Sequence, residues 1–363
     1  MRLHDHDMKN ATRPSLAFPA PFRLLGVAAV FVASLRAQAP AAPNDVDRAW
    51  DTLRTTVEIG TPTGAMAVRD SAARATEAAA YVAQANQVRD FYVRYPGHSG
   101  VAEARRLEAL LLSQAALRGD SAQDGRLAAL VNTVRVDNSI PALRRFEAVA
   151  WSKQVTLARQ RLTARPAVLG AHELIAKALV AEFPSVDVAF ESWLAVARDS
   201  APADAWRICT EIASSLAPAR IKSGAQVIVA RTRLIGRPLR DVLGATQAAA
   251  LLTASDGKPV VIYSWSSQAP SSVSAITRNA PKLAVAGLVG ICLDADTVAG
   301  RAAAANAPLP GTQYFNAGGA ASPLAEALLF TEPGMTYIAD RQGIIRDIHG
   351  RSELVAKLAR YSR

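Results

Sequence analysis

The chain has 363 residues, of which 50% are apolar and 20% are charged. It is longer than most single domains, and its composition excludes a chain that is disordered throughout. The formal net charge of +10 comes from 41 basic and 31 acidic residues. These basic residues form no dense block with interleaved aromatic residues, so we expect no nucleic-acid partner.

The first 39 residues have the pattern of an export signal. A basic leader ends at Arg23, a 12-residue apolar stretch runs from Leu24 to Leu35, and small residues follow at 37–39. This stretch suits a signal peptide and is too short to span a bilayer, which takes about 20 residues. We therefore expect residues 1–39 to be a signal peptide, and a retained membrane anchor stays open as the alternative. In both cases the chain is exported, to the periplasm, with no integral membrane domain beyond this segment.

Residues 44–234 are rich in alanine and leucine, with apolar residues at helical spacing. We expect an all-α domain over this range, with turns near Pro96, Pro141, Pro184 and Pro202. The expected helical segments are residues 47–59, 65–95, 101–117, 123–134, 141–162, 171–183, 188–198 and 202–216.

Two aromatic-proline turns, Tyr95–Pro96 and Phe183–Pro184, are each followed by an alanine-containing helical segment. This arrangement resembles the hairpins of tetratricopeptide-like repeats. The full 34-residue pattern of that repeat is absent. A repeat-like domain and a non-repeating helical bundle therefore both stay open.

The composition changes near Val260, after which β-branched and aromatic residues gather into short runs. Val260–Trp265 and Leu288–Asp294 are predicted to be buried strands, and the helical pattern at 272–283 between them predicts parallel neighbours. The remaining expected elements are a helix at 297–305, a strand at 313–315, a helical turn at 323–328, strands at 335–339 and 344–348, and a helix at 353–361. The expected fold class is thus an α+β multidomain chain, with a linker at 235–256 and an α/β domain at 257–363.

Three segments of this last domain, Gly257–Trp265, Leu288–Asp294 and Tyr337–Gly343, carry a resemblance to a known family in their order and spacing. They resemble the TlpA-like and AhpC/TSA-type redoxin domains of the thioredoxin superfamily. In that family, a strand with a Gly-Lys start leads into a Trp-Cys-x-x-Cys motif. The resemblance implies a thioredoxin-like α/β fold for residues 257–363 and the activity of a thiol oxidoreductase or peroxidase.

The resemblance fails at the redox motif. Counted from Trp265, the attacking cysteine of the family corresponds to Ala269 and the resolving cysteine to Ser272. Neither residue forms the thiolate that the exchange reaction requires, so dithiol chemistry is excluded there. The family's cis-proline is also displaced, because Pro333 stands one residue early and Gly334 takes its place. Either this loop shifts by one residue or the cis peptide is lost.

The region after Ala269 should still open a helix, because Pro270 suits a first helical turn. We expect Ser267 or Ser272 to cap that helix by accepting a backbone hydrogen bond.

The two cysteines, Cys209 and Cys292, fall in different expected domains, and we interpret both as buried apolar residues that form no disulfide. A reactive role for Cys209 stays open, because Arg207 would lower its pKa if the thiol were exposed. The sequence His172-Glu-Leu-Ile-Ala176 begins like a zinc-protease motif but lacks its second histidine, so no metal pair forms.

These patterns favour a non-catalytic binding or scaffold protein of the cell envelope, a pseudoenzyme with no cofactor and no catalytic residue. Its helical region would bind a protein partner. The alternative is a thiol oxidoreductase or peroxidase that acts through Cys209, outside the motif.

Overall fold

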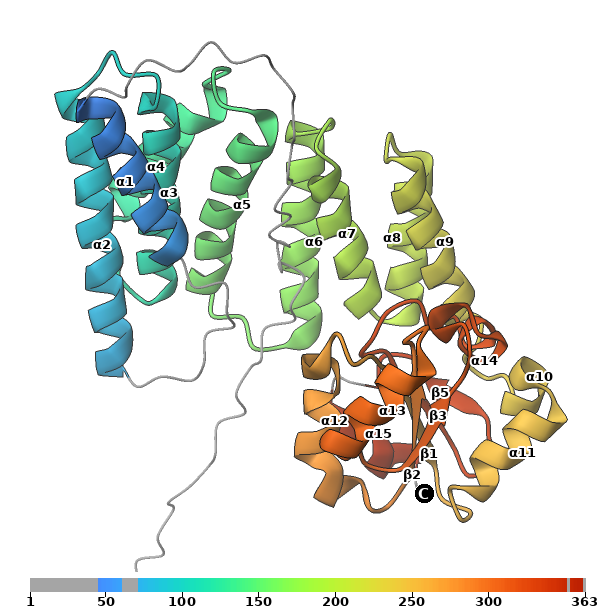
Figure 1. The fold of residues 1–363 in the computed structure, drawn as a ribbon. Coiled ribbons are helices and arrows are strands. Elements are labelled where there is room, and N and C mark those ends of the chain that lie inside the picture. Colours follow the sequence, from blue (N-terminus) through green and yellow to red (C-terminus); the bar gives the residue numbers. More distant parts are fainter. Residues whose placement is uncertain (1–44, 61–70, 351–352, 362–363) are drawn as a thin grey trace, which may run out of the picture. The chain divides into compact units, whose positions relative to one another are not determined.

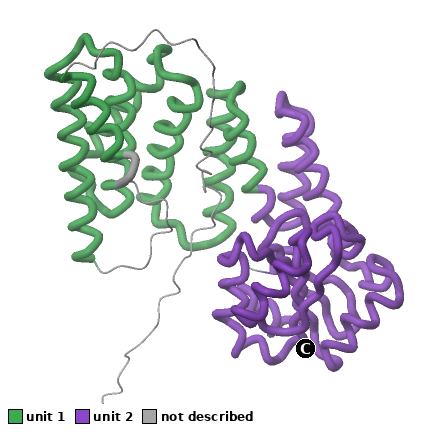
Figure 2. Tube along the Cα trace, viewed as in Figure 1, with its two compact units in different colours: residues 1–196 green, residues 197–363 purple. Residues whose placement is uncertain are grey.

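The computed structural model describes residues 45–60, 71–350 and 353–361. The expected signal peptide at 1–39 and the first residues of the expected helix at 65–95 lie outside the described residues. The chain divides into two compact units, Met1–Val196 (unit 1) and Ala197–Arg363 (unit 2) (Figure 2). This division falls earlier than the composition change on which the expected domain boundary depends.

The described part of unit 1 is wholly helical, as the sequence predicts (Figure 1). Its helices are α1 (Asp45–Gly60), α2 (Ser71–Arg94), α3 (Val101–Leu117), α4 (Asp124–Val136), α5 (Ala142–Arg159), α6 (Arg165–Glu182) and α7 (Asp187–Asp199), and the last of these crosses the division between the units. The turn between α2 and α3 falls at Pro96, and the turn before α5 falls at Pro141.

Helix α3 is central to unit 1 because α2, α4 and α5 all contact it. It is buried on every side, and it therefore buries Arg106 and Glu108 together with its leucines and alanines. Buried charges are costly unless they are paired and hydrogen-bonded. Both charges on α3 meet this condition.

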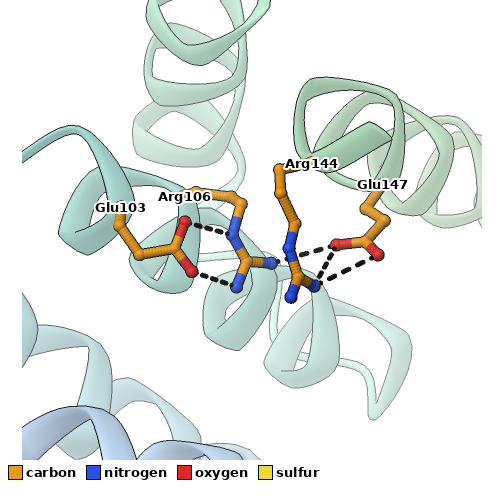
Figure 3. A network of polar contacts seen from close by, with 4 residues as sticks. All are labelled: Glu103, Arg106, Arg144 and Glu147. Atoms are coloured by element: carbon orange, nitrogen blue, oxygen red, sulfur yellow. Dashed lines mark hydrogen bonds and ion pairs between the residues drawn. The ribbon is translucent and has the colours of Figure 1, made fainter. Parts of the chain in front are cut away.

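Arg106 lies at the centre of a polar network between α3 and α5 (Figure 3). Its Nε and Nη2 atoms donate to the two carboxylate oxygens of Glu103, at 2.8 and 2.6 Å. Its Nη1 atom donates to Glu147 on α5 at 3.2 Å, and Arg144 also binds Glu147, at 3.0 Å. The network fixes how α3 and α5 face each other.

Glu108 joins α3 to the two other neighbours. Arg126 on α4 donates from Nε to one carboxylate oxygen at 2.6 Å, and the Tyr92 hydroxyl on α2 donates to the other at 2.6 Å. Burial, together with the bond to this carboxylate, raises the pKa of Tyr92 to about 12. The phenol therefore stays protonated and able to donate at neutral pH.

After the end of α7, unit 2 continues with α8 (Pro202–Ser214) and α9 (Ala219–Thr232), which contact each other. The expected linker at 235–256 contains two further helices, α10 (Leu239–Leu243) and α11 (Ala245–Thr253). They belong to the core of the sheet, because their leucines and alanines are buried there; these are Leu239, Leu243, Ala248 and Leu251. These four residues follow one another at intervals of three to five positions, which is close to the period of a helix. Composition alone does not reveal this spacing.

Five strands form one mixed sheet in the order β3-β2-β1-β4-β5. The strands are β1 (Val260–Trp265), β2 (Gly287–Cys292), β3 (Thr312–Phe315), β4 (Thr336–Ala339) and β5 (Ile345–Asp347). β1 and β2 are parallel neighbours, with Trp265 opposite Cys292, which confirms the prediction from the sequence. β3 is parallel to β2, whereas β4 is antiparallel to β1 and β5 to β4.

Helices cover both faces of the sheet. The connecting elements are the 3-10 helices η1 (Pro270–Val273), η2 (Ala280–Leu283) and η3 (Gly319–Ala321), and the α-helices α12 (Ser274–Asn279), α13 (Thr297–Asn306), α14 (Pro323–Ala327) and α15 (Leu354–Tyr361). Val260 and Ile262 share one core with α10, α11 and α14, and Val261 and Tyr263 share another with α12 and α15. Because β1 is covered on both sides, its apolar run is continuous rather than alternating. Among the described residues, the helices are all too short or too polar to cross a membrane.

Candidate functional site

The candidate site lies where β1 and β2 end, at the edge of the sheet where parallel strands place their carboxyl ends. Asp294 follows β2 and is 8% exposed. Its carboxylate accepts a short hydrogen bond from the Ser266 hydroxyl and a 2.9 Å bond from the Ser267 backbone N–H. The Ser266 oxygen in turn accepts from the backbone N–H of Gln268 at 3.2 Å. A buried carboxylate thus fixes the turn that follows β1.

Burial alone would raise the pKa of Asp294, but hydrogen bonds from Ser266, Ser267 and Cys292 outweigh it and lower the pKa. The side chain is therefore ionised at neutral pH. From the sequence, Asp294 is expected only as the last residue of a strand, with no role in a site. The sequence feature that could have identified it is a single carboxylate directly after a buried apolar run, at the end of a predicted strand.

Ala269 and Ser272 lie in this turn, on either side of the start of η1. Ala269 is the residue before η1, and its carbonyl accepts the Ser272 backbone N–H at 2.9 Å. The helix that the sequence predicts after Pro270 is present as η1 followed by α12. The predicted capping is wrong: neither η1 nor α12 has a side-chain cap, because Ser267 turns toward Asp294 through its backbone and the Ser272 hydroxyl is buried without a hydrogen-bond partner.

The loop that contains Pro333 and Gly334 is attached to β1 through Ser264. The Gly334 N–H donates to the Ser264 carbonyl at 2.8 Å, and the Ser264 hydroxyl donates to the Glu332 carbonyl at 2.7 Å. The Met335 N–H donates back to that hydroxyl at 3.0 Å. No peptide bond among the described residues is cis, so the bond before Pro333 is trans. Of the two alternatives at this loop, the structure has the one without a cis peptide.

Cys292 ends β2 and is 1% exposed, as predicted. Burial, together with the neighbouring charge of Asp294, raises its pKa to about 11. α13 seals it: a Cβ atom at Gly300 would lie 2.6 Å from the Cys292 sulfur, so only glycine allows the helix to come this close. The thiol is protonated and enclosed.

Cys209 on α8 is also 1% exposed and unbridged. Burial raises its pKa to about 11, against the opposing charge of Arg231. Arg207, the basic neighbour expected from the sequence, instead binds Glu211 at 2.8 Å on the exposed face of α8. The basic neighbour of the thiol is therefore Arg231, from α9, and it does not make the thiol acidic.

The remaining sequence candidates do not form a site. His172 is buried in α6, and burial lowers its pKa. Ala176 lies buried one turn later on the same helix. In the part of the chain that the structure describes, no three His, Cys, Asp or Glu side chains gather as a metal site would require.

Chemically, the end of β1 offers a fixed turn, a buried anion and hydroxyl groups, but no nucleophile that ionises near neutral pH. A serine hydroxyl becomes nucleophilic only beside a general base. Asp294 accepts the Ser266 hydroxyl, but its lowered pKa makes it a weak base. Comparisons of the chain with protein-family models, with curated proteins and with solved structures find no match.

Proposed function

We propose that residues 257–363 are a thioredoxin-like redoxin domain that has lost its thiol chemistry, and that the chain is a non-catalytic binding protein of the cell envelope. The order of the strands, the parallel pair β1 and β2 and the antiparallel β4 support this relationship. The signal expected at residues 1–39 would export the chain to the periplasm. The helical unit would bind a protein partner, and the sheet would serve as a rigid platform.

One observation carries the proposal: the turn where the family keeps its cysteines is held by Asp294 and contains no thiol. The two thiols of the chain are both buried, with pKa values of about 11. At neutral pH such a thiol is ionised in roughly one molecule in ten thousand, against a few per cent for a free cysteine. The alternative function, through Cys209, would need that thiol to be accessible and acidic.

An insulin-reduction assay with dithiothreitol tests the proposal. The full chain should give no turnover above the uncatalysed rate, and its Cys209→Ala variant should behave identically. In parallel, a thiol reagent at neutral pH should label Cys209 slowly in the folded protein and rapidly after denaturation. Turnover that disappears in Cys209→Ala would establish the oxidoreductase instead, and fast labelling of Cys209 in the folded state would favour it.

A further inference from the structure

Unit 1 contains a pocket of about 680 Å³ between the start of α2, the end of α3 and the end of α5. Its volume lies within the range of about 300–1,000 Å³ that is typical of ligand sites. Small apolar side chains form much of its wall: Ala75, Ala78 and Ala79 from α2, Ala116 from α3 and Ala158 from α5. The pocket is therefore roomy because its walls are alanine.

Four arginines line the same pocket, and two of them are already matched by carboxylates. Arg118 donates to Glu77 at 2.8 Å and lies over the Tyr81 ring at 4.5 Å. Arg159 binds Asp124 at 3.2 Å. These two guanidinium groups hold the helix ends together and are structural.

The other two arginines, Arg74 on α2 and Arg161 just after α5, are exposed. Among the described residues, neither is within ion-pair distance of a carboxylate. Other exposed arginines of unit 1, such as Arg48, Arg54 and Arg135, are paired to carboxylates. Neither positive charge is therefore held in an ion pair by a described residue; the carboxylate of Asp120, which also lines the pocket, accepts the Ala122 N–H.

Arg161 also has a backbone conformation that favours other residues. Its φ is +50°, the left-handed region in which glycine or asparagine usually ends a helix. For a residue with a long side chain this conformation costs about 1–2 kcal/mol. The chain thus places a guanidinium group at the pocket where a smaller residue would fit the backbone better.

We propose that this pocket binds an acidic peptide segment, with one carboxylate for Arg74 and one for Arg161. A guanidinium group binds one carboxylate through two parallel hydrogen bonds, so two free arginines on separate elements match two separate acidic side chains. The alanine walls suit small apolar residues between those carboxylates. A compact phosphate would instead need donors that converge on one point and would leave the apolar wall uncovered. The inference rests on the proposed function, since it gives the chemistry of the partner that unit 1 would bind.

The test uses the full chain and a fluorescein-labelled peptide with two glutamates separated by three alanines. Fluorescence anisotropy should show binding that weakens as salt is added, because the contacts are ionic. The same peptide with glutamines should bind at least about tenfold more weakly, as should the variant Arg74→Gln/Arg161→Asn, since a charged hydrogen bond contributes more than 1.4 kcal/mol. Asparagine tolerates the left-handed backbone at 161, so far-UV circular dichroism should be unchanged.

Arg94→Gln is the matched control. Arg94 is an exposed arginine at the other end of α2, 20 residues from Arg74 and hence about 30 Å along the helix. The Arg94→Gln substitution removes one positive charge from the same helix and should leave the affinity for the peptide unchanged.

Three results would overturn the proposal: no binding of the glutamate peptide, equal binding by the double variant, or displacement of the peptide by inorganic phosphate at lower concentration than by unlabelled peptide. The last would assign a phosphate site. If any of these results is found while insulin reduction stays at the uncatalysed rate, the peptide-binding pocket is refuted and the non-catalytic function is not. Insulin turnover with intact peptide binding refutes the non-catalytic function and leaves the pocket.

Discussion

Helix α3 in unit 1 and strand β1 in unit 2 are both buried along their length, but they are tied to their neighbours in different ways. α3 uses charged side chains, Arg106 and Glu108, that bind residues on α2, α4 and α5. β1 uses its backbone, which pairs with β2 and β4, and buries mainly apolar side chains.

The difference follows from where each element satisfies its own backbone. A helix forms its backbone hydrogen bonds internally, so only side chains can select which helix lies beside it. A strand must find its backbone partners outside itself, and this selects its neighbours directly. Removing one charge from α3 should therefore damage unit 1 more than removing an exposed charge, and β1 should tolerate changes beyond its end.

The largest effect is expected for Glu108→Met. It would leave the Arg126 guanidinium and the Tyr92 hydroxyl without their buried acceptor, and breaking such a pair typically costs about 3–5 kcal/mol. Urea unfolding followed by far-UV circular dichroism measures this loss. Asp90→Asn, at an exposed carboxylate on α2, is the control and should change stability by less than about 0.5 kcal/mol.

The double variant Glu108→Met/Arg126→Met sharpens this prediction. It removes both charges and should be more stable than Glu108→Met alone, because no buried charge is left without a partner. If the two variants were equally unstable, the loss would come from packing and the comparison between α3 and β1 would fail.

A smaller effect is expected on the pH dependence of stability, which should differ between the two units. In unit 1, burial lowers the pKa of His172, so below about pH 6.5 the unfolded chain takes up a proton that the folded chain refuses, and stability falls. In unit 2, the pKa of Asp294 is lowered below 3.8, so its contribution is complete above that value and is lost only in stronger acid. Each proton changes stability by at most about 1.4 kcal/mol per pH unit.

Urea midpoints between pH 7.5 and pH 3 measure both windows. In a plot of the urea midpoint against pH, His172→Leu should reduce the slope just below about pH 6.5 and leave the slope in stronger acid unchanged. Asp294→Asn should instead reduce the slope below about pH 4. A His172→Leu curve parallel to the wild-type curve between pH 6.5 and 5 would show that the imidazole does not titrate differently on folding.

The smallest effect concerns the end of β1. Ala269→Cys/Ser272→Cys should restore a pair close enough to oxidise, because the carbonyl at 269 already accepts the N–H at 272. The thiol at 269 stands directly before the N-terminus of η1, where the positive end of the peptide dipoles should hold its pKa below the ordinary value of about 8.5. Ultraviolet titration of the thiolate decides this, with Thr277→Cys, at an exposed position inside α12, as the control. A pKa at or above the ordinary value would mean that the Asp294 charge dominates the turn.

The centre of the sheet could be predicted from the sequence because β1 and β2 are short apolar runs between turn residues. Val260–Trp265 and the run that ends in Cys292 carry this signal within their own residues. The helical content of residues 44–234 follows in the same way from local spacing. These features need no knowledge of what lies across the fold.

The features that the sequence did not reveal depend on residues far apart in the chain. Glu108 has a structural role because Tyr92 and Arg126 donate hydrogen bonds to it, and Asp294 has one because the Ser267 backbone donates to it. Basic residues that are evenly spread along the sequence gather at one pocket only when three helix ends meet. Composition also left α10 and α11 in an expected linker, although α11 consists mainly of alanine and leucine, the residues that favour a helix.

The close approach of α13 to Cys292 has a consequence for the motions of unit 2. Because the helix itself covers the sulfur at Gly300, a reagent reaches the thiol only when α13 separates from β2. When reclosing is faster than the chemical reaction, the labelling rate equals the intrinsic rate multiplied by the fraction of time the helix is open. The labelling rate of Cys292 then reports how often α13 separates from β2, and no probe has to be introduced into the protein.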